Sequence, residues 1–288
     1  MMEFLNFYVV PGIVTGSVYA LGAIGITLIF GILRFGHFAH GDLATSGAYL
    51  ALGATALLGL TPWAALPVAM VLTALLAYGI HRLFYRHLES RPKILTVIAS
   101  LGIGMMLRSI VQVVWGVDPL AYGSGIARAQ AFGPLMLRPR EIATLALTLA
   151  LVAALLAFLR YSKWGKAMRA MSDNPDLARL CGVDNDRVTR LTWFIVGALA
   201  AASGFCLGIN TELTTMMGWS AMLSMFAAAV LGGVGRVEGA VVGGLVIGLA
   251  EELSVLVVPS PYKSATAFVI LLAILLLRPQ GIFKGKVL

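Results

Sequence analysis

Residues 10–33 read VPGIVTGSVYALGAIGITLIFGIL, a run that contains no charged side chain. A helix needs about 20 mostly apolar residues to cross the roughly 30 Å of hydrocarbon in a bilayer. Within lipid, the backbone hydrogen bonds must be satisfied inside the segment, which a helix does. The run therefore predicts a membrane-spanning helix close to the N-terminus.

The composition extends this prediction to the whole chain. Of 288 residues, 59% are hydrophobic and 12% are charged, and the mean hydropathy is +0.92. A soluble domain carries about 25% charged residues. So few charges cannot cover a water-soluble surface, so lipid must cover most of this one.

Eight further apolar runs follow the first. They lie at 38–60, 62–84, 94–115, 140–160, 189–209, 220–236, 239–258 and 265–277. The last run is short, and the seventh and eighth meet at Gly235-Arg236-Val237-Glu238, so half-helices or re-entrant segments are an alternative there. The run at 38–60 is the other span left open. We expect an all-α, polytopic membrane protein with eight or nine transmembrane helices. No polar segment is long enough to fold alone, so residues 1–288 are expected to form one transmembrane domain.

The lysines and arginines give the orientation. A nine-span arrangement with the N-terminus outside places sixteen of the 21 cations on one side and Arg108 within a span; the remaining four are Arg128, Arg138, Arg140 and Lys263. Cytoplasmic loops carry the excess of Lys and Arg, so we predict an outside N-terminus and a cytoplasmic C-terminus. The net charge of +8 arises from these loop clusters, which argues against nucleic-acid binding.

Glycines recur at a spacing of four in three places. These are Gly12xxxGly16, Gly239xxxGly243 and Gly244xxxGly248. Small residues at this spacing let helix backbones approach closely in a membrane. Tight packing and helix breaks that line a path are the two interpretations.

The longest polar stretch, at about 161–188, contains a short helix whose two ends are marked by capping residues. Asn174 is a favoured N-cap, Pro175 fits the first helical position, and Gly182 fits the left-handed position that ends a helix. A helix of about two turns is not stable alone in water, so it must pack on something. It either rests on its own protein or docks into a cytoplasmic partner, and the residues alone leave both open.

At this point the chain resembles a known family, the LivH-type permeases of bacterial branched-chain amino acid ATP-binding-cassette (ABC) importers. The resemblance covers about residues 10–283. One position departs from the family pattern: His37 stands where that family often has Asn. It is carried, in order, by Phe38-Ala39-His40-Gly41-Asp42 with Ser46-Gly47-Ala48-Tyr49, the glycine-rich block at 228–235 with Glu238-Gly239-Ala240, and Arg278-Pro279-Gln280-Gly281.

The resemblance implies the ABC-importer permease fold and a location in the bacterial inner membrane. It implies a second related permease, two cytoplasmic ATPase subunits and an extracytoplasmic binding protein as partners. The segment at about 161–188 would couple to the ATPases, which would move it and switch the path between outward and inward access. The residues that match the coupling pattern are Ala170, Asn174, Ala178, Leu180 and Gly182.

The chain lacks the motifs of catalysis and of cofactor binding. No GxxxxGK[ST] phosphate loop occurs, so ATP and Mg are expected to be used by the partner ATPases. The two cysteines show no metal-ligand spacing, and His37 and His40 have no third ligand nearby. We expect no enzyme activity, no bound cofactor and no metal in this chain.

Polar residues inside the membrane are functional candidates by default. Thr45, Ser46 and Ser100 are candidates either for helix packing or for lining the translocation path. Of Glu251 and Glu252, one is expected to pair with Lys263 or to line the mouth of the path, and we take Glu252 as the path candidate.

Four charged or polar residues near the second run are expected at the cytoplasmic interface: Arg34, His37, His40 and Asp42. Arg108 should face a partner span or a cavity if it lies deep, or reach the interface if it lies near the end of its run.

Three other functions compete with amino acid import. A permease for urea or short amides would look similar. An ion-coupled secondary transporter would need a central acidic residue and inverted repeats, and no convincing repeat is present. A purely structural membrane subunit would leave the helix at 174–182 unexplained.

Overall fold

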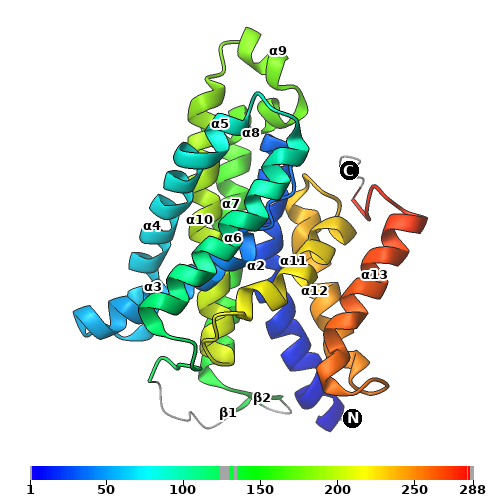
Figure 1. Ribbon diagram of the computed structural model, residues 1–288. Coiled ribbons are helices and arrows are strands. Elements are labelled where there is room, and N and C mark those ends of the chain that lie inside the picture. Colours follow the sequence, from blue (N-terminus) through cyan, green and yellow to red (C-terminus); the bar gives the residue numbers. More distant parts are fainter. Residues whose placement is uncertain (1, 124–129, 133–134, 284, 286–288) are drawn as a thin grey trace.

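The computed structural model describes residues 2–123, 130–132, 135–283 and 285, and these are almost entirely helical (Figure 1). Arg128, Lys284 and Lys286, three of the cations used for the orientation, lie outside the described residues. The first helix is continuous through α1 (Met2–Phe4), the π-helical segment η1 (Leu5–Val9) and α2 (Val10–Leu33). The other long helices are α3 (His40–Leu58), α4 (Pro62–Ile80), α6 (Lys93–Trp115), α7 (Pro139–Tyr161), α10 (Asn185–Asn210), α11 (Met217–Gly232), α12 (Val237–Ser254) and α13 (Lys263–Leu277).

Short elements join or extend these helices. The end of α4 continues into η2 (His81–Tyr85) and α5 (Arg86–Leu88), and η3 (Ser260–Tyr262) leads into α13. Between α7 and α10 lie α8 (Lys163–Asp173) and α9 (Pro175–Leu180). Strands β1 (Gln130–Phe132) and β2 (Leu135–Leu137) pair antiparallel, with Gln130 opposite Leu137.

Each predicted apolar run corresponds to one long helix. Fewer of these helices, however, have both the length and the apolar composition that a membrane span needs. In the described part of the chain, six helical segments are long and apolar enough to cross a membrane. They are Leu5–Leu33, Pro62–Leu88, Lys93–Trp115, Pro139–Tyr161, Asn185–Asn210 and Ser260–Leu277. The 16 residues of α11 rise only about 24 Å. A multi-pass helical protein is thus confirmed, whereas a count of eight or nine spans stays a prediction.

The position of α3 and α12 explains why they are less apolar. Helix α3 packs between α4, α10, α11 and α6, and α12 packs against α2, α11 and α13. Asp42 on α3 and Glu251 on α12 are both buried. A lipid-facing helix must be apolar, but an enclosed one can carry polar groups if they find partners. A hydropathy criterion alone therefore fails to recognise these two helices as part of the membrane domain.

The glycine pairs bring α2 and α12 into backbone contact. A Cβ atom at Gly16 would lie 2.8 Å from Cα of Leu245, and one at Gly248 would lie 2.3 Å from Cα of Gly16. Gly243 meets the carbonyl of Ala228 on α11 in the same way. The packing interpretation of these motifs is confirmed, because their glycines face neighbouring helices at distances that exclude a side chain.

Replacing Gly248 with alanine is expected to lower the free energy of unfolding by about 1–3 kcal/mol, the usual cost of overpacking a tight contact. Thermal unfolding of the purified chain in detergent measures the change. Gly79→Ala on α4 is the matched control, since its Cβ would meet nothing within 4 Å; there alanine should be neutral or slightly stabilising. Equal effects at the two positions would contradict the close contact.

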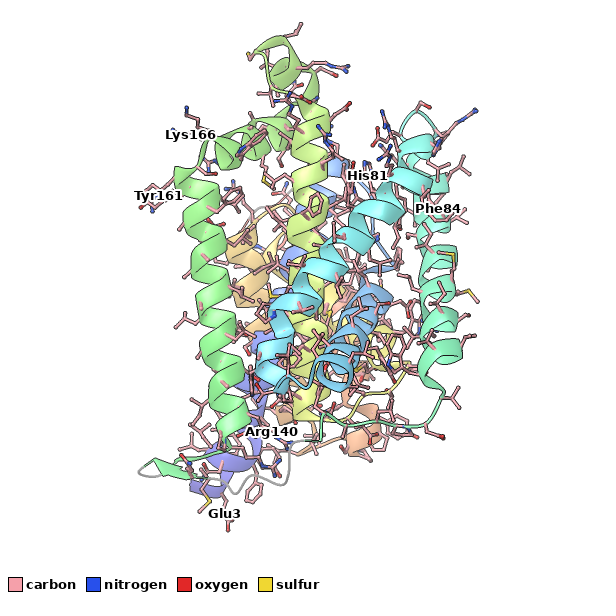
Figure 2. The ribbon with its side chains drawn as sticks, turned by 90° about the vertical axis from the view of Figure 1, so that its left-hand side faces the viewer. Glu3, His81, Phe84, Arg140, Tyr161 and Lys166 are labelled. Atoms are coloured by element: carbon pink, nitrogen blue, oxygen red, sulfur yellow. The ribbon has the colours of Figure 1, made fainter. Side chains whose placement is uncertain are left out.

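The two ends of the molecule differ in charge. Figure 1 shows α8 and α9 at one end, called the α9 end, and the β1–β2 hairpin with α1 at the other, called the hairpin end. In Figure 2, Lys166 and His81 lie toward the α9 end, and Arg140 and Glu3 lie at the hairpin end. The cation-rich segments at 81–93 and 160–190 both belong to the α9 end, as the predicted separation of charge requires.

Candidate functional site

The N-terminus of α9 is capped as the sequence predicts. Oδ1 of Asn174 accepts hydrogen bonds from the backbone N–H groups of Asp176 at 3.1 Å and Leu177 at 3.0 Å. Pro175 occupies the first helical position, where its missing N–H would have no partner in the helix. Asn174 therefore sets where the helix begins.

The C-terminus of α9 is also fixed locally. Gly182 has a φ of +83°, a left-handed conformation that costs glycine little. The N–H of Val183 donates to the carbonyl of Ala178 at 3.0 Å, and that of Gly182 donates to Arg179 at 3.0 Å. This pair of bonds is a Schellman motif, which confirms the predicted end of the helix.

One face of α9 is anchored to the rest of the protein. Ala178 is only 4% exposed, and Nδ2 of Asn185 at the start of α10 donates to the carbonyl of Pro175 at 3.0 Å. Before it, the hydroxyl of Ser172 on α8 donates to the carbonyl of Gly31 on α2 at 2.9 Å. The segment is thus attached to two central helices, α2 and α10.

The other face of α9 is apolar and exposed. Leu177 is 58% and Leu180 is 85% exposed, and α9 projects beyond the ends of the long helices (Figure 1). Ala170 and Asn174 are exposed as well. Packing on its own protein is therefore confirmed for the face that carries Ala178, and docking into a partner stays a prediction for the face that carries Leu177 and Leu180.

The three hydroxyls predicted as packing or path residues are all buried and all bonded. Oγ1 of Thr45 accepts from the N–H of Gly218 on α11 at 3.0 Å. The hydroxyl of Ser46 donates to the carbonyl of Asp42 at 2.8 Å. Ser100 on α6 accepts from the N–H of Phe38 at 3.1 Å. Thr45 and Ser100 therefore join separate segments, the packing role named for them.

The two glutamates of α12 have different surroundings. Glu252 accepts from Nζ of Lys263 at 2.8 Å, which is the predicted pairing and ties α12 to the start of α13. Glu251 is completely buried and accepts from the hydroxyl of Tyr19 at 2.8 Å and from that of Ser224. It links α12 to α2 and α11.

A buried ion pair holds α3 to α6. Nε and Nη2 of Arg108 donate to Oδ1 and Oδ2 of Asp42 at 2.9 and 3.1 Å. The Asp42 side chain is 1% exposed and that of Arg108 is 16% exposed. The guanidinium also lies 5.0 Å from the ring centre of Trp219 on α11. Gly104 makes room for the pair, since a Cβ there would lie 2.6 Å from Oδ2 of Asp42.

This pair corrects one expectation from the sequence. We expected Arg34, His37, His40 and Asp42 to share the cytoplasmic interface, but His37, His40 and Asp42 are buried between helices. The signal was present: Arg108 and Asp42 each lie within an apolar run, and unpaired charges inside a membrane are costly. Their charges indicated that each needs a partner but did not say which one.

His37 and His40 belong to an aromatic cluster. The His37 ring is 5.2 Å from that of Trp193, 5.6 Å from that of Tyr85 and 6.0 Å from that of His40, all edge-to-face. Among the described residues, no three His, Cys, Asp or Glu side chains converge as metal ligands would. Aromatic packing explains the position of His37.

Two of the sequence motifs pack against each other. The turn at Arg278-Pro279-Gln280-Gly281 reverses the chain with Gly281 at a φ of +69°. The N–H groups of Ile282 and Phe283 then donate to the carbonyls of Leu231 and Gly232 at 2.8 and 3.2 Å. The segment after α13 is thus hydrogen-bonded to the glycine-rich block at the end of α11.

Comparisons with known proteins agree with this architecture. Residues 8–277 match the protein family described as "Branched-chain amino acid transport system / permease component". The chain is 32% identical over 286 residues to the high-affinity branched-chain amino acid transport system permease protein LivH of Escherichia coli (strain K12), covering 94% of this chain and 92% of that protein. It is 31% identical to BraD, the corresponding permease protein of Pseudomonas aeruginosa, covering 95% and 94%.

A solved structure shares the fold. It is that of PsaBC from Streptococcus pneumoniae in complex with Fab, with a TM-score of 0.50, 14% identity, and coverage of 94% of this chain and 91% of that chain. The family match covers every long helix from α2 to α13. The chain therefore belongs to the family of branched-chain amino acid transport permease components.

Proposed function

We propose that this chain is the permease subunit of an ATP-driven importer that moves branched-chain, hydrophobic amino acids across the bacterial inner membrane. Family membership and the similarity to LivH and BraD, both named as branched-chain amino acid transport permeases, support the substrate class. In this proposal the α9 end faces the cytoplasm, because Lys and Arg concentrate there. Eight or nine of the long helices cross the membrane, with the N-terminus outside.

The observation that carries the proposal is the exposed apolar face of α9. Helix α9 projects from the cation-rich end (Figure 1), and its Leu177 and Leu180 are exposed side by side, which we take as the interaction surface. We infer that they enter a groove on a cytoplasmic ATPase. Two such ATPases, which use ATP and Mg, a second related permease and an extracytoplasmic binding protein complete the transporter.

The connection from α9 to α10 gives the coupling a physical route. Asn185 ties the start of α10 to Pro175, and α10 packs against α2, α3 and α4 in the centre of the protein. A displacement of α9 by an ATPase therefore acts directly on a central helix. Nucleotide binding would bias the equilibrium between outward and inward access in this way.

The four residues predicted as path candidates have two different roles in this proposal. Thr45, Ser46 and Ser100 hold the helices together through their bonded hydroxyls. Glu252 keeps a partly exposed side chain beside Lys263 near the hairpin end. We assign this pair to the outer mouth of the path, where it would meet solute delivered from outside.

Uptake in a strain that lacks the gene tests the substrate class. Complementation with this chain and its partner subunits should restore accumulation of labelled leucine at least tenfold over the empty vector, because the path is proposed to accept apolar side chains. Labelled urea should show no restored uptake. Restoration of urea uptake without leucine uptake would replace the proposal with the amide permease alternative.

A further inference from the structure

A polar cavity of about 240 Å³ opens at the α9 end, away from α9 itself. Its walls are the end of α4 with η2 and α5 on one side and the first turns of α10 on the other. Figure 2 shows α4 and α10 next to each other, with His81 at this level. The proposed function uses none of the residues that line this cavity.

The cavity carries an excess of positive charge. Arg82 and Arg86 line it from one side and Arg190 from the other. In the described part of the chain, these three guanidinium groups form no ion pair. Glu89 and Asp186 also line it, and burial together with the charge of Asp186 raises the pKa of Glu89. Three cations against two carboxylates favour an anionic ligand.

Two buried polar side chains lie beside the arginines. His81 and Thr189 both line the cavity and are each 6% exposed. Nδ1 of His81 has no hydrogen-bond partner among the described residues. Its Nε2 lies 3.9 Å from Oε1 of Glu89, so His81 and Thr189 add polar walls to the cavity beside the arginines.

An apolar groove of about 460 Å³ continues from the cavity. It shares Tyr78 and Arg190 with the cavity and is completed by Arg187 at the charged end and by Trp164, Leu191 and Phe194. The rings of Tyr78 and Phe194 stack at 5.1 Å and form its floor. Phe194 lies one helical turn further along α10 than Arg190, so the groove runs from the charged end into the membrane span.

We propose that the cavity and groove together bind one anionic phospholipid. Its phosphate would lie among Arg82, Arg86 and Arg190, and one acyl chain would lie along Tyr78 and Phe194. Cationic pockets at the cytoplasmic end of transmembrane helices suit anionic headgroups, and the adjoining apolar groove distinguishes a lipid from free phosphate. Trp164 belongs to α8, so the bound lipid would connect α4 and α10 to the segment that precedes α9.

Lipid binding to the purified, delipidated full chain tests the proposal by native mass spectrometry. Phosphatidylglycerol and phosphatidylcholine with the same acyl chains are the probes, and inorganic phosphate is the competitor. The native chain should prefer phosphatidylglycerol. Arg82→Gln/Arg190→Gln should weaken its binding by about 30-fold, since one cation near a headgroup contributes roughly fivefold. Each single variant should lose about fivefold, which keeps the test available if the double variant fails to fold.

Arg91→Gln/Arg179→Gln is the matched control, because both arginines are exposed at the same end but line neither cavity nor groove. It should bind phosphatidylglycerol within twofold of the native chain. Equal losses in the two double variants would overturn the site. Displacement of the lipid by 10 mM inorganic phosphate would overturn the lipid assignment. Loss of ATPase co-purification with unchanged lipid binding would assign the arginines to a protein interface instead.

Discussion

Replacing Leu177 and Leu180 together with aspartate is expected to abolish leucine uptake while leaving the chain folded. Both side chains are largely exposed, so the fold loses little when they change. On docking, each buried leucine contributes about 1.5–3 kcal/mol, and a carboxylate in an apolar groove adds a desolvation cost. We expect ATPase binding to weaken by at least about 3 kcal/mol, or more than 100-fold.

Two measurements check this result: co-purification of the ATPase in mild detergent and uptake of labelled leucine. Leu177→Met/Leu180→Met is the matched control, since methionine keeps apolar surface of similar volume, and it should retain both properties. Co-purification and uptake at the native level in the aspartate variant would show that this face of α9 does not contact the ATPase.

A substitution of Ala178 tests a different property, although Ala178 belongs to the same set of predicted coupling residues. Its side chain faces the protein, and its carbonyl accepts the bond that closes the helix. A bulky charged residue there would displace α9 from α10. Loss of transport in such a variant would report on the anchoring of the segment, whereas the leucine pair reports on its outer contact.

Replacing Asp42 with asparagine is expected to lower the free energy of unfolding by about 3–5 kcal/mol, because it leaves the charge of Arg108 buried without its partner. Thermal unfolding in detergent and the amount of chain recovered from membranes measure the effect. The double variant Asp42→Asn/Arg108→Met should recover most of the loss, since replacing both charges removes the uncompensated one.

Asp184→Asn provides the control for that experiment. Asp184 pairs with Arg187 at 2.8 Å, but the two side chains are 45% and 63% exposed. A solvent-exposed pair contributes about 0–1 kcal/mol, so a small change is expected. A comparable loss in the two aspartate variants, or no recovery in the double variant, would contradict a dominant role for burial of the Asp42–Arg108 pair.

Features that depend on neighbours in sequence were predictable. Asn174 and Gly182 fix the two ends of α9 by bonds to residues at most five positions away, so their types and spacing were sufficient. The apolar runs and the glycines at a spacing of four likewise depend on helix geometry alone. The separation of Lys and Arg between the two ends follows from the order of the runs.

Other features depend on which helices become neighbours, and the sequence does not state this. Arg108 and Asp42 are 66 residues apart, and only the packing of α3 on α6 turns two isolated charges into a pair. Helix packing also buries Asp42 on α3 and Glu251 on α12, which is why hydropathy by itself could not fix the number of spans. Tertiary structure also turned Ala178 inward and left Leu177 and Leu180 outside. The sequence by itself determined a helical membrane protein with a capped helix in its longest polar segment. Tertiary structure decided which faces are covered, because burial and charge pairing depend on distances between helices far apart in the chain.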